Sequence, residues 1–394
     1  MSYWSAQEVS HMKEAIRLAR QGWGLVSPNP MVGAALVKKG KIIATGWHAG
    51  PGQPHAEIVA LAEAGKKAQG ATLFVNLEPC RHVGRTGPCV DAIIQAKVAK
   101  VHYSIPDPHP EAGGGAKILA DAGIEVDRGL LSREAIDLNQ FFLKSAIRET
   151  PFVIIKTAAS LDGKISTGAG DSRWISSKVA RNYGHHLRAG VDAILIGRAT
   201  AAKDDPELSA RPWGRRKMHR QPWRAVLDAS LKLPLSLKLF DPERGGPSVA
   251  FAGPDASERK AKELEARGVK VIRLPVLEKG LLSLTAALKA LRALGVQSVL
   301  IEPGATLASS ALILEPIVDL GHVFLAPKFI GGFNAPSMLG GAGAALLKDA
   351  KEIDILRVAR KGPDLHLVFR PKEGFALTLS ADGELTESPA EPLE

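Results

Sequence analysis

The residues best suited to chemistry are His55-Ala56-Glu57, followed by Pro79-Cys80 and Pro88-Cys89. One imidazole and two thiolates supply three ligands for a tetrahedral Zn²⁺ and leave the fourth position for water. Zinc in such an open site lowers the pKa of its water and generates hydroxide near neutral pH. Glu57 lies two residues past the histidine, where it can move the proton of that water to a leaving nitrogen. We therefore predict one catalytic zinc per chain, with Glu57 as the catalytic acid/base of a hydrolytic deamination.

The cysteine spacing departs from the general zinc-deaminase layout, in which two residues separate the cysteines. Here residues 81–88 lie between Cys80 and Cys89. A longer loop can still bring both sulfur atoms to one ion, because a proline before each cysteine fixes the local turn. One alternative is a structural zinc that takes His82 as its fourth ligand. Another is a pair of incidental cysteines.

Composition narrows the class of protein. A chain of 394 residues that is 45% hydrophobic and 23% charged predicts two or three globular domains. It contains no run of about 18 apolar residues, so no membrane span is expected. A polar N-terminus and only two cysteines indicate a cytoplasmic protein in a reducing compartment. The net charge of +10 favours an anionic partner, either nucleic acid or a phosphorylated small molecule, unless the surface is merely basic.

The elements expected around these residues alternate between strand and helix. A capping box at Ser5 and Glu8 predicts a first helix, and the apolar runs around Lys39-Gly40 predict a β-hairpin. His55 then begins a helix, and a buried strand precedes Cys80. Further helices are expected at 90–96, 115–123 and 132–149, and strands at 71–77, 98–105 and 124–129. This order predicts an α/β sandwich with a partly parallel sheet.

The alternation restarts after a predicted boundary near 147–151. Strands are expected at 151–160, 191–197, 224–230, 247–253, 269–275, 298–304 and 321–329, and helices at 176–190, 256–268 and 281–295. We therefore predict a second α/β domain over 149–372 after a first domain over 1–148. The segment 373–394 is expected to hold a strand end and then a mobile tail, because residues 379–394 are acidic and lose all periodicity.

Candidate ligand-binding residues in the second domain follow strand ends. Thr200, Asp204, Asp205 and Arg211 lie in a predicted loop after a strand, where α/β proteins place ligand sites. The string IEPGATLASS predicts a strand, a glycine turn and a helix whose first N–H groups suit a phosphate. No G-x-G-x-x-G follows a strand, so the usual dinucleotide fingerprint is absent. The glycine cluster at 340–343 is interpreted as a flexible loop.

The string LEPCRHVGRTGPC, with PNPMVG at 28–33 and HAE at 55–57, resembles the deaminase half of the bifunctional riboflavin-biosynthesis deaminase/reductases. The resemblance implies a cytidine-deaminase-like α/β/α sandwich that hydrolyses the amino group of a phosphoribosylated diaminopyrimidinone. It implies zinc on His55, Cys80 and Cys89, with Glu57 as the proton shuttle. Substrate contacts are implied for Asn29, His48, His82 and Arg85.

Most of 151–370 resembles the reductase half of the same family. This implies a dihydrofolate-reductase-like α/β domain in which NADPH reduces the ribose to a ribityl chain. Implied cofactor contacts are Ala158, Trp174, Thr200, Asp204, Gly304, Ala305, Thr306, Leu307, Ala308, Ser309 and Ser310. Implied substrate contacts are Ser172, Arg188, Leu208, Arg211 and Glu302, with Lys156 and Asp162 as supporting groups.

Plainer interpretations remain for several of these residues. Asn29 could be an ordinary turn residue, and His48 a structural residue of the hairpin. Trp174 could lie in a core, Arg188 at a helix C-terminus, and Glu302 on the surface. Three positions depart from the family. Pro303 replaces a small residue, His109 replaces Asn, and 211–224 is unusually basic. The basic loop suits either the 2′-phosphate of NADP or solvent.

Two other functions remain open from the residues alone. A nucleic-acid-editing deaminase would use the same zinc chemistry on a flipped base, and a non-catalytic basic module would hold a structural zinc. The long cysteine loop and the second domain favour the bifunctional enzyme. We therefore expect a phosphorylated pyrimidine as its small-molecule substrate, no nucleic-acid or membrane partner, and a homo-oligomer.

Overall fold

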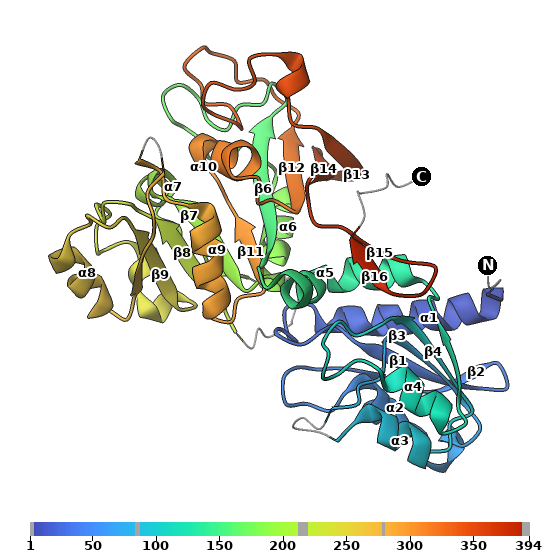
Figure 1. Cartoon of the computed structure of the whole chain (residues 1–394). Coiled ribbons are helices and arrows are strands. Elements are labelled where there is room, and N and C mark those ends of the chain that lie inside the picture. Colours follow the sequence, from blue (N-terminus) through green and yellow to red (C-terminus); the bar gives the residue numbers. More distant parts are fainter. Residues whose placement is uncertain (1–3, 83–86, 212–219, 278–279, 388–394) are drawn as a thin grey trace. The chain divides into compact units, whose positions relative to one another are not determined.

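The computed structural model describes residues 4–82, 87–211, 220–277 and 280–387. These residues form two compact units, each an α/β fold (Figure 1). The first unit comprises the chain up to Glu149 together with 376–387, and the second comprises 150–375.

The first unit is built on a five-stranded sheet in the order β2-β1-β3-β4-β5. Strand β1 runs antiparallel to both of its neighbours, whereas β3, β4 and β5 are parallel. The strands are β1 (Gly33–Lys38), β2 (Lys41–Trp47), β3 (Thr72–Leu77), β4 (Lys100–Ile105) and β5 (Glu125–Arg128). The helices are α1 (Ala6–Ala19), η1 (Arg20–Gly22), α2 (Ala56–Ala64), η2 (Gly65–Ala68), α3 (Cys89–Gln95), α4 (Gly115–Asp121) and α5 (Ser132–Arg148). The predicted partly parallel α/β sandwich is confirmed.

Local sequence signals explain how this sandwich begins. The hydroxyl of Ser5 accepts the Glu8 N–H at 3.2 Å, and the Ser5 N–H donates to the Glu8 carboxylate at 2.8 Å, so the predicted capping box starts α1. Close packing of α1 on β1 requires Gly33, because a Cβ there would lie 2.1 Å from the Ala15 carbonyl oxygen. Helices α1 and α5 lie over one face of the sheet, and α2, α3 and α4 lie over the other (Figure 1).

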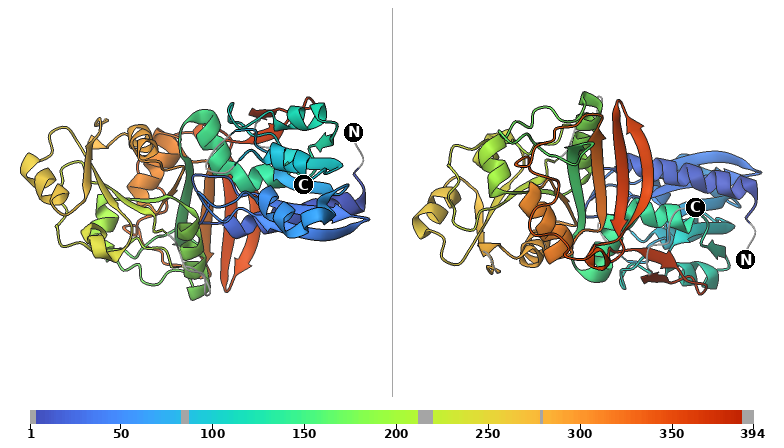
Figure 2. Two further views of the ribbon diagram at one scale, coloured as in Figure 1. Left: turned by 90° about the horizontal axis from the view of Figure 1, so that it is seen from below. Right: turned by 90° about the horizontal axis from the view of Figure 1, so that it is seen from above.

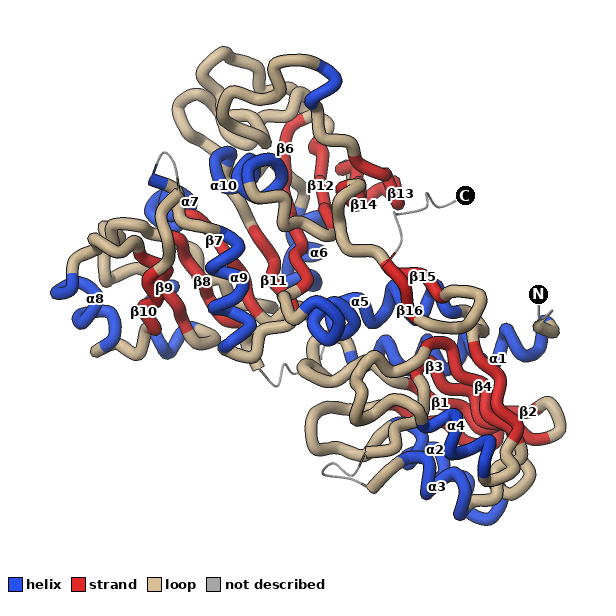
Figure 3. The backbone as a smooth tube through the Cα atoms, in the orientation of Figure 1, coloured by secondary structure: helices blue, strands red, loops and turns tan. Residues whose placement is uncertain are grey.

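The second unit is built on a nine-stranded sheet in the order β10-β9-β8-β7-β11-β6-β12-β14-β13 (Figure 3). All pairings from β10 to β12 are parallel, and β14 and β13 add an antiparallel edge. The strands are β6 (Phe152–Ser160), β7 (Ala193–Gly197), β8 (Trp223–Leu227), β9 (Ser248–Ala252), β10 (Lys270–Arg273), β11 (Ser298–Ile301), β12 (Leu320–Ala326), β13 (Ile353–Lys361) and β14 (Asp364–Pro371). The helices are α6 (Lys178–Gly190), α7 (Arg198–Asp204), η3 (Lys238–Phe240), η4 (Pro242–Arg244), α8 (Glu258–Glu265), α9 (Leu284–Ala293), α10 (Ala305–Ser309), η6 (Ser310–Leu314) and η7 (Leu347–Asp349).

Helices cover both faces of this sheet. Leu291 of α9 and Leu307 of α10 belong to the same buried cluster as Ile155 of β6. On the opposite face, Tyr183 of α6 packs against the rings of Phe324 and His366, with ring centroids 5.9 and 4.9 Å apart. The antiparallel pair β14 and β13 lies beside β12 (Figure 2). A parallel sheet buried on both faces is the arrangement expected of an α/β domain.

Three segments differ from the sequence prediction. Residues 198–204, expected as loop, form α7, and β13 and β14 form a hairpin that was not predicted. The mobile tail expected over 379–394 is wrong for its described part, because this part completes the hairpin of β15 (Leu377–Leu379) and β16 (Leu385–Glu387) in the first unit.

Side-chain contacts anchor the β15–β16 hairpin. Leu377 and Leu385 pack against the buried core of the first unit. Arg148 pairs with Glu387, and Arg128 donates to the Asp382 carbonyl. Among the described residues, no helix is long and apolar enough to cross a bilayer.

Candidate functional site

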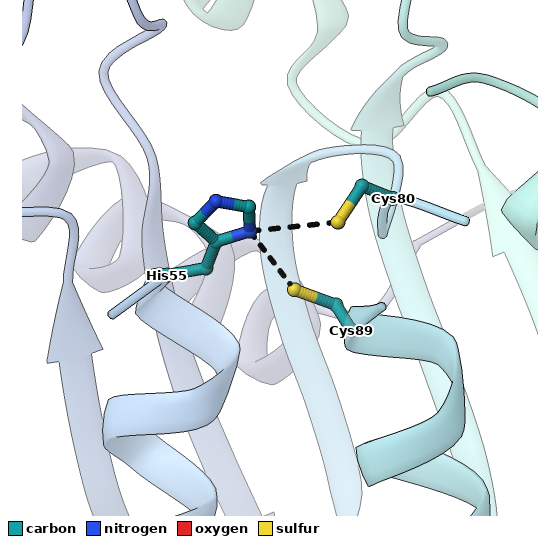
Figure 4. Close-up of side chains that lie close together, drawn as sticks. All are labelled: His55, Cys80 and Cys89. Atoms are coloured by element: carbon teal, nitrogen blue, oxygen red, sulfur yellow. Dashed lines mark hydrogen bonds between the residues drawn. The ribbon is translucent and has the colours of Figure 1, made fainter. Parts of the chain in front are cut away.

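Three element ends bring the predicted metal ligands together (Figure 4). His55 is the N-cap of α2, Cys80 follows β3, and Cys89 is the first residue of α3. The His55 Nδ1 atom lies 3.4 Å from the Cys80 sulfur and 3.2 Å from the Cys89 sulfur. The three ligand atoms lie within 4.8 Å of one another, close enough to surround one ion.

The charges of this cluster fit a divalent cation. The hydrogen bond from Cys89 lowers the pKa of the Cys80 thiol to about 4, although burial opposes this. The same hydrogen bond, and then burial, raises the pKa of Cys89. The two sulfurs therefore share one proton because two neighbouring thiolates repel each other. A cation between them removes this conflict, and one nitrogen with two sulfurs is a donor set that zinc prefers.

Glu57 is placed beside the cluster by the first turn of α2. Its side chain is 3% exposed, which is unusual for a carboxylate. Burial, and next the negative charge of Cys80, raises the pKa of the Glu57 carboxyl to about 7. A carboxyl group in such surroundings can hold or release a proton near neutral pH.

Two of the predicted substrate residues form a hydrogen-bonded pair. The Asn29 amide nitrogen lies 2.9 Å from His48 Nε2, and His48 Nδ1 lies 3.1 Å from the Pro54 carbonyl oxygen. The His48 ring also meets His55 edge-on, with centroids 5.4 Å apart. His48 is buried, and burial lowers its pKa, so the ring is neutral and both of its nitrogens are engaged.

The other two substrate predictions have different outcomes. His82 is half-buried, and it is not among the three residues that form the metal-binding cluster in the described chain. This disfavours the closed four-ligand site. Arg85 lies outside the described residues.

Sequence reasoning missed Glu78, which supports the loop next to Cys80. Glu78 is 6% exposed. Its carboxylate accepts the N–H groups of Gly114 and Ala116 at 3.1 and 2.9 Å, and of Asp107 at 3.3 Å. The available signal was an acidic residue directly before the Pro-Cys pair. His109, the departure noted above, places its ring against Phe142, with centroids 5.3 Å apart.

In the second unit, the predicted substrate residues Arg188 and Glu302 form a bidentate ion pair. The Arg188 Nε and Nη2 atoms donate to the two carboxylate oxygens at 2.8 and 2.6 Å. Although burial opposes this, the Arg188 charge holds the pKa of Glu302 at about 2. Lys156 lies nearby on β6, where burial lowers the pKa of its ammonium group. The structure thus joins three predicted groups into one half-buried charged cluster.

The predicted cofactor residues line a separate hollow. A cavity of about 450 Å³ lies between the start of α7 and the start of α10. Its lining includes six predicted contacts: Thr200, Gly304, Ala305, Thr306, Leu307 and Ser310. Ala308 and Ser309 are buried and do not line this cavity, and the Ser309 hydroxyl donates to the Gly340 carbonyl at 2.5 Å. Pro303 precedes the Gly304 N-cap, so it removes no N–H from the first turn of α10.

The remaining predicted residues of the second unit belong neither to the lining of this cavity nor to the ion pair. The Trp174 side chain is 66% exposed and stacks under Arg181, so it is not a core aromatic. The Asp204 carbonyl accepts from Arg173 at 3.0 Å, and Leu208 is buried. Ala158 and Ser172 are half-buried, and Arg211 is exposed. Most of the basic 211–224 segment lies outside the described residues.

Comparison with known families divides the chain in the same way. The family described as "Cytidine and deoxycytidylate deaminase zinc-binding region" matches residues 5–105. The family described as "RibD C-terminal domain" matches residues 151–367. The first match contains His55, Cys80 and Cys89, and the second contains the Arg188–Glu302 pair.

Two similar proteins align with this chain over nearly their whole length. The riboflavin biosynthesis protein RibD of Aquifex aeolicus is 40% identical over 363 residues, which are 92% of this chain and 98% of that protein. The RibD of Escherichia coli is 38% identical over 376 residues, 92% of this chain and 99% of that protein.

Solved structures agree with these matches. A RibD structure from Acinetobacter baumannii has a TM-score of 0.83 at 36% identity and covers 93% of this chain and 99% of its own. A diaminohydroxyphosphoribosylaminopyrimidine deaminase/5-amino-6-(5-phosphoribosylamino)uracil reductase from Thermotoga maritima has a TM-score of 0.80 at 33% identity, with the same coverage. The resemblance inferred from the sequence motifs is confirmed, and the chain belongs to the RibD family of riboflavin biosynthesis proteins.

Proposed function

We propose that this chain deaminates a phosphoribosylated diaminopyrimidinone in its first unit and reduces the ribose of the product to a ribityl chain in its second. The observation that carries the proposal is the His55, Cys80 and Cys89 cluster, with the buried Glu57 beside it. A RibD-type second unit in the same chain supports the coupled reduction.

For the deamination, His55, Cys80 and Cys89 would hold zinc, which acidifies a water molecule when bound. Glu57 takes up a proton from the attacking water and delivers it to the departing amino group, which leaves as ammonia. Its burial keeps bulk water from competing for that proton. Asn29 faces a base edge with its amide, and His48 fixes the orientation of that amide by its own bond to Asn29.

For the reduction, NADPH would supply the hydride, and the cavity beside α10 suits part of this cofactor because hydroxyl residues such as Thr200 and Thr306 line it among apolar ones. Arg188 and Glu302 orient one another and so fix the polar face of the substrate site. Lys156 places a half-buried amine on β6 close to this pair, where its charged form favours an electron-rich substrate atom. Arg211 and Ser172 supply further polar groups for the substrate.

Two finer assignments belong to this proposal. A homo-oligomer is supported by large apolar side chains exposed on the second unit, among them Phe329 and Phe333 at 77% and 103% exposure. A cytoplasmic location is supported by the free, buried Cys80 and Cys89 thiols, since a reducing compartment keeps such ligands available for metal.

A two-step assay tests the function. The full chain is supplied with the phosphoribosylated diaminopyrimidinone and NADPH, and ammonia release and NADPH oxidation are followed together. We expect ammonia release to precede NADPH oxidation and to continue when NADPH is omitted. The absence of both signals, combined with salt-dependent binding of single-stranded oligonucleotide, would instead support a nucleic-acid deaminase.

A further inference from the structure

The segment that carries Asn29 is held by two buried amide side chains that lie outside the metal cluster. These are Asn76 at the end of β3 and Asn139 in the middle of α5, with exposures of 0% and 2%. Both contact Met31, two residues after Asn29. Neither amide was singled out by the sequence motifs, and neither touches the metal ligands through any described hydrogen bond.

The hydrogen bonds satisfy both backbone groups of Met31. The Met31 N–H donates to the Asn139 side-chain oxygen at 2.8 Å. The Met31 carbonyl accepts from the Asn139 amide at 3.1 Å and from the Asn76 amide at 2.9 Å. Asn76 also accepts the Gly33 N–H at 2.8 Å, so the following residues are fixed to β3. Buried backbone groups paired in this way do not shift without loss of those bonds.

A continuous series of contacts leads from Asn139 to the metal ligands. Asn139 holds Met31, and Asn29, two residues earlier in the chain, bonds through its side chain to His48. The His48 ring then packs edge-on against His55. Asn139 therefore sets the place of the Asn29 amide from α5, a helix that contributes none of the metal ligands.

We propose that Asn139 is a positioning residue for the deamination: it fixes the loop so that Asn29 meets the pyrimidine in the correct place. This inference rests on the proposed function of the first unit. Asn139 touches neither substrate nor metal, so its loss acts on substrate binding and leaves zinc content unchanged. The second unit reports on the integrity of the chain, because its reaction uses none of these residues.

The test measures deaminase kinetics of Asn139→Asp and Asn139→Ala in the full chain. In Asn139→Asp the size is kept, but an oxygen replaces the amide nitrogen that faces the Met31 carbonyl, so attraction becomes repulsion. We expect the KM for the phosphoribosylated diaminopyrimidinone to rise about tenfold, with a smaller change in kcat. Zinc content and NADPH oxidation on previously deaminated substrate are expected to match the wild type.

Two controls separate positioning from loss of stability. Ile136→Val removes one methylene from a core residue one turn earlier in α5, and it is expected to lower the melting temperature without raising KM. In an Asn29→Ala background, Asn139→Asp is expected to change KM by less than about twofold, because the positioned group is already missing.

Three outcomes would overturn the proposal. They are an unchanged KM in Asn139→Asp, an equal rise in KM in Ile136→Val, or effects of Asn29→Ala and Asn139→Asp that simply multiply. If wild-type protein released no ammonia while binding zinc, the proposed function itself would fail, and the two failures are thereby distinguished.

Discussion

The two candidate sites are built by different means. In the first unit the chemistry lies in four side chains within a short stretch of sequence, at the ends of α2, β3 and α3. In the second unit, it lies in a half-buried ion pair from two distant segments and in a cavity lined largely by small residues. A metal cluster demands particular residue types, whereas a cofactor cavity demands a shape. Single substitutions should therefore abolish the activity of the first unit but only weaken that of the second.

The largest effect is expected for Cys89→Ala. This change removes one of three ligands and leaves two, which are too few to hold zinc firmly. Bound zinc should fall from one per chain to near zero, and ammonia release should fall by more than about 10⁴-fold, the upper range for a single acid–base group. Metal analysis and an ammonia assay check this. Retained NADPH oxidation on deaminated substrate is the control. Full deaminase activity without metal would show that the first unit does not depend on its metal cluster.

Glu57→Gln should separate metal binding from proton transfer. The amide keeps the shape of the buried side chain but cannot carry the proton, so ammonia release should fall by about 10² to 10⁴-fold. Zinc content should remain that of the wild type, as measured by metal analysis on the same sample. Unchanged turnover would favour a structural zinc and a non-catalytic module.

Glu302→Gln tests the ion pair of the second unit through stability. The pKa of Glu302 lies at about 2 rather than the ordinary 4.5. This difference corresponds to a contribution of about 3 kcal/mol to the free energy of unfolding at neutral pH. Because the folded-state pKa is depressed, the contribution is complete above about pH 4.5 and is lost as the pH falls toward about 2.

Unfolding of wild type and Glu302→Gln should be compared between pH 7 and pH 2. The variant should be less stable at pH 7 because Arg188 is left buried without its partner. The difference in the free energy of unfolding between wild type and variant should shrink as the pH falls. If this difference were independent of pH, the Arg188–Glu302 pair would stabilise the fold through packing and not through charge.

The smallest effect is expected for Gly304→Ala at the edge of the cavity. A Cβ there would meet the Thr200 hydroxyl at 3.5 Å, an ordinary contact, so the fold should tolerate it. The methyl group enters space proposed for NADPH, and a loss of about 1 kcal/mol would raise the KM for NADPH about fivefold. Steady-state kinetics measure this, and ammonia release serves as the control. A change in deaminase activity would contradict the assignment of this cavity to the reductase.

The sequence predicted the sandwich, the strand order along the chain and the metal ligands, because each depends on local patterns. It did not predict β13, since a register shift between Ile355 and Arg357 breaks the two-residue alternation of that strand. The β15–β16 hairpin was missed because each strand has only three residues, although Ser380 and Gly383 form a recognisable turn.

Asn76 and Asn139 were missed for a different physical reason. Each is an ordinary polar residue in its own element, and its importance comes from a partner 45 or 108 positions away in the chain. The Arg188–Glu302 contact, 114 positions apart, was predicted only as two separate residues from the family resemblance. Local spacing identifies which residues can do chemistry, but the groups that orient them are found only when the chain has folded.

The return of residues 376–387 to the first unit means that the polypeptide passes between the units twice. Synthesis from the N-terminus therefore delivers the entire second unit before the hairpin that closes the first. The Arg148–Glu387 pair and the apolar contacts of Leu377 and Leu385 form only after the second unit has been translated. On the ribosome, the first unit thus begins before the second and is completed after it.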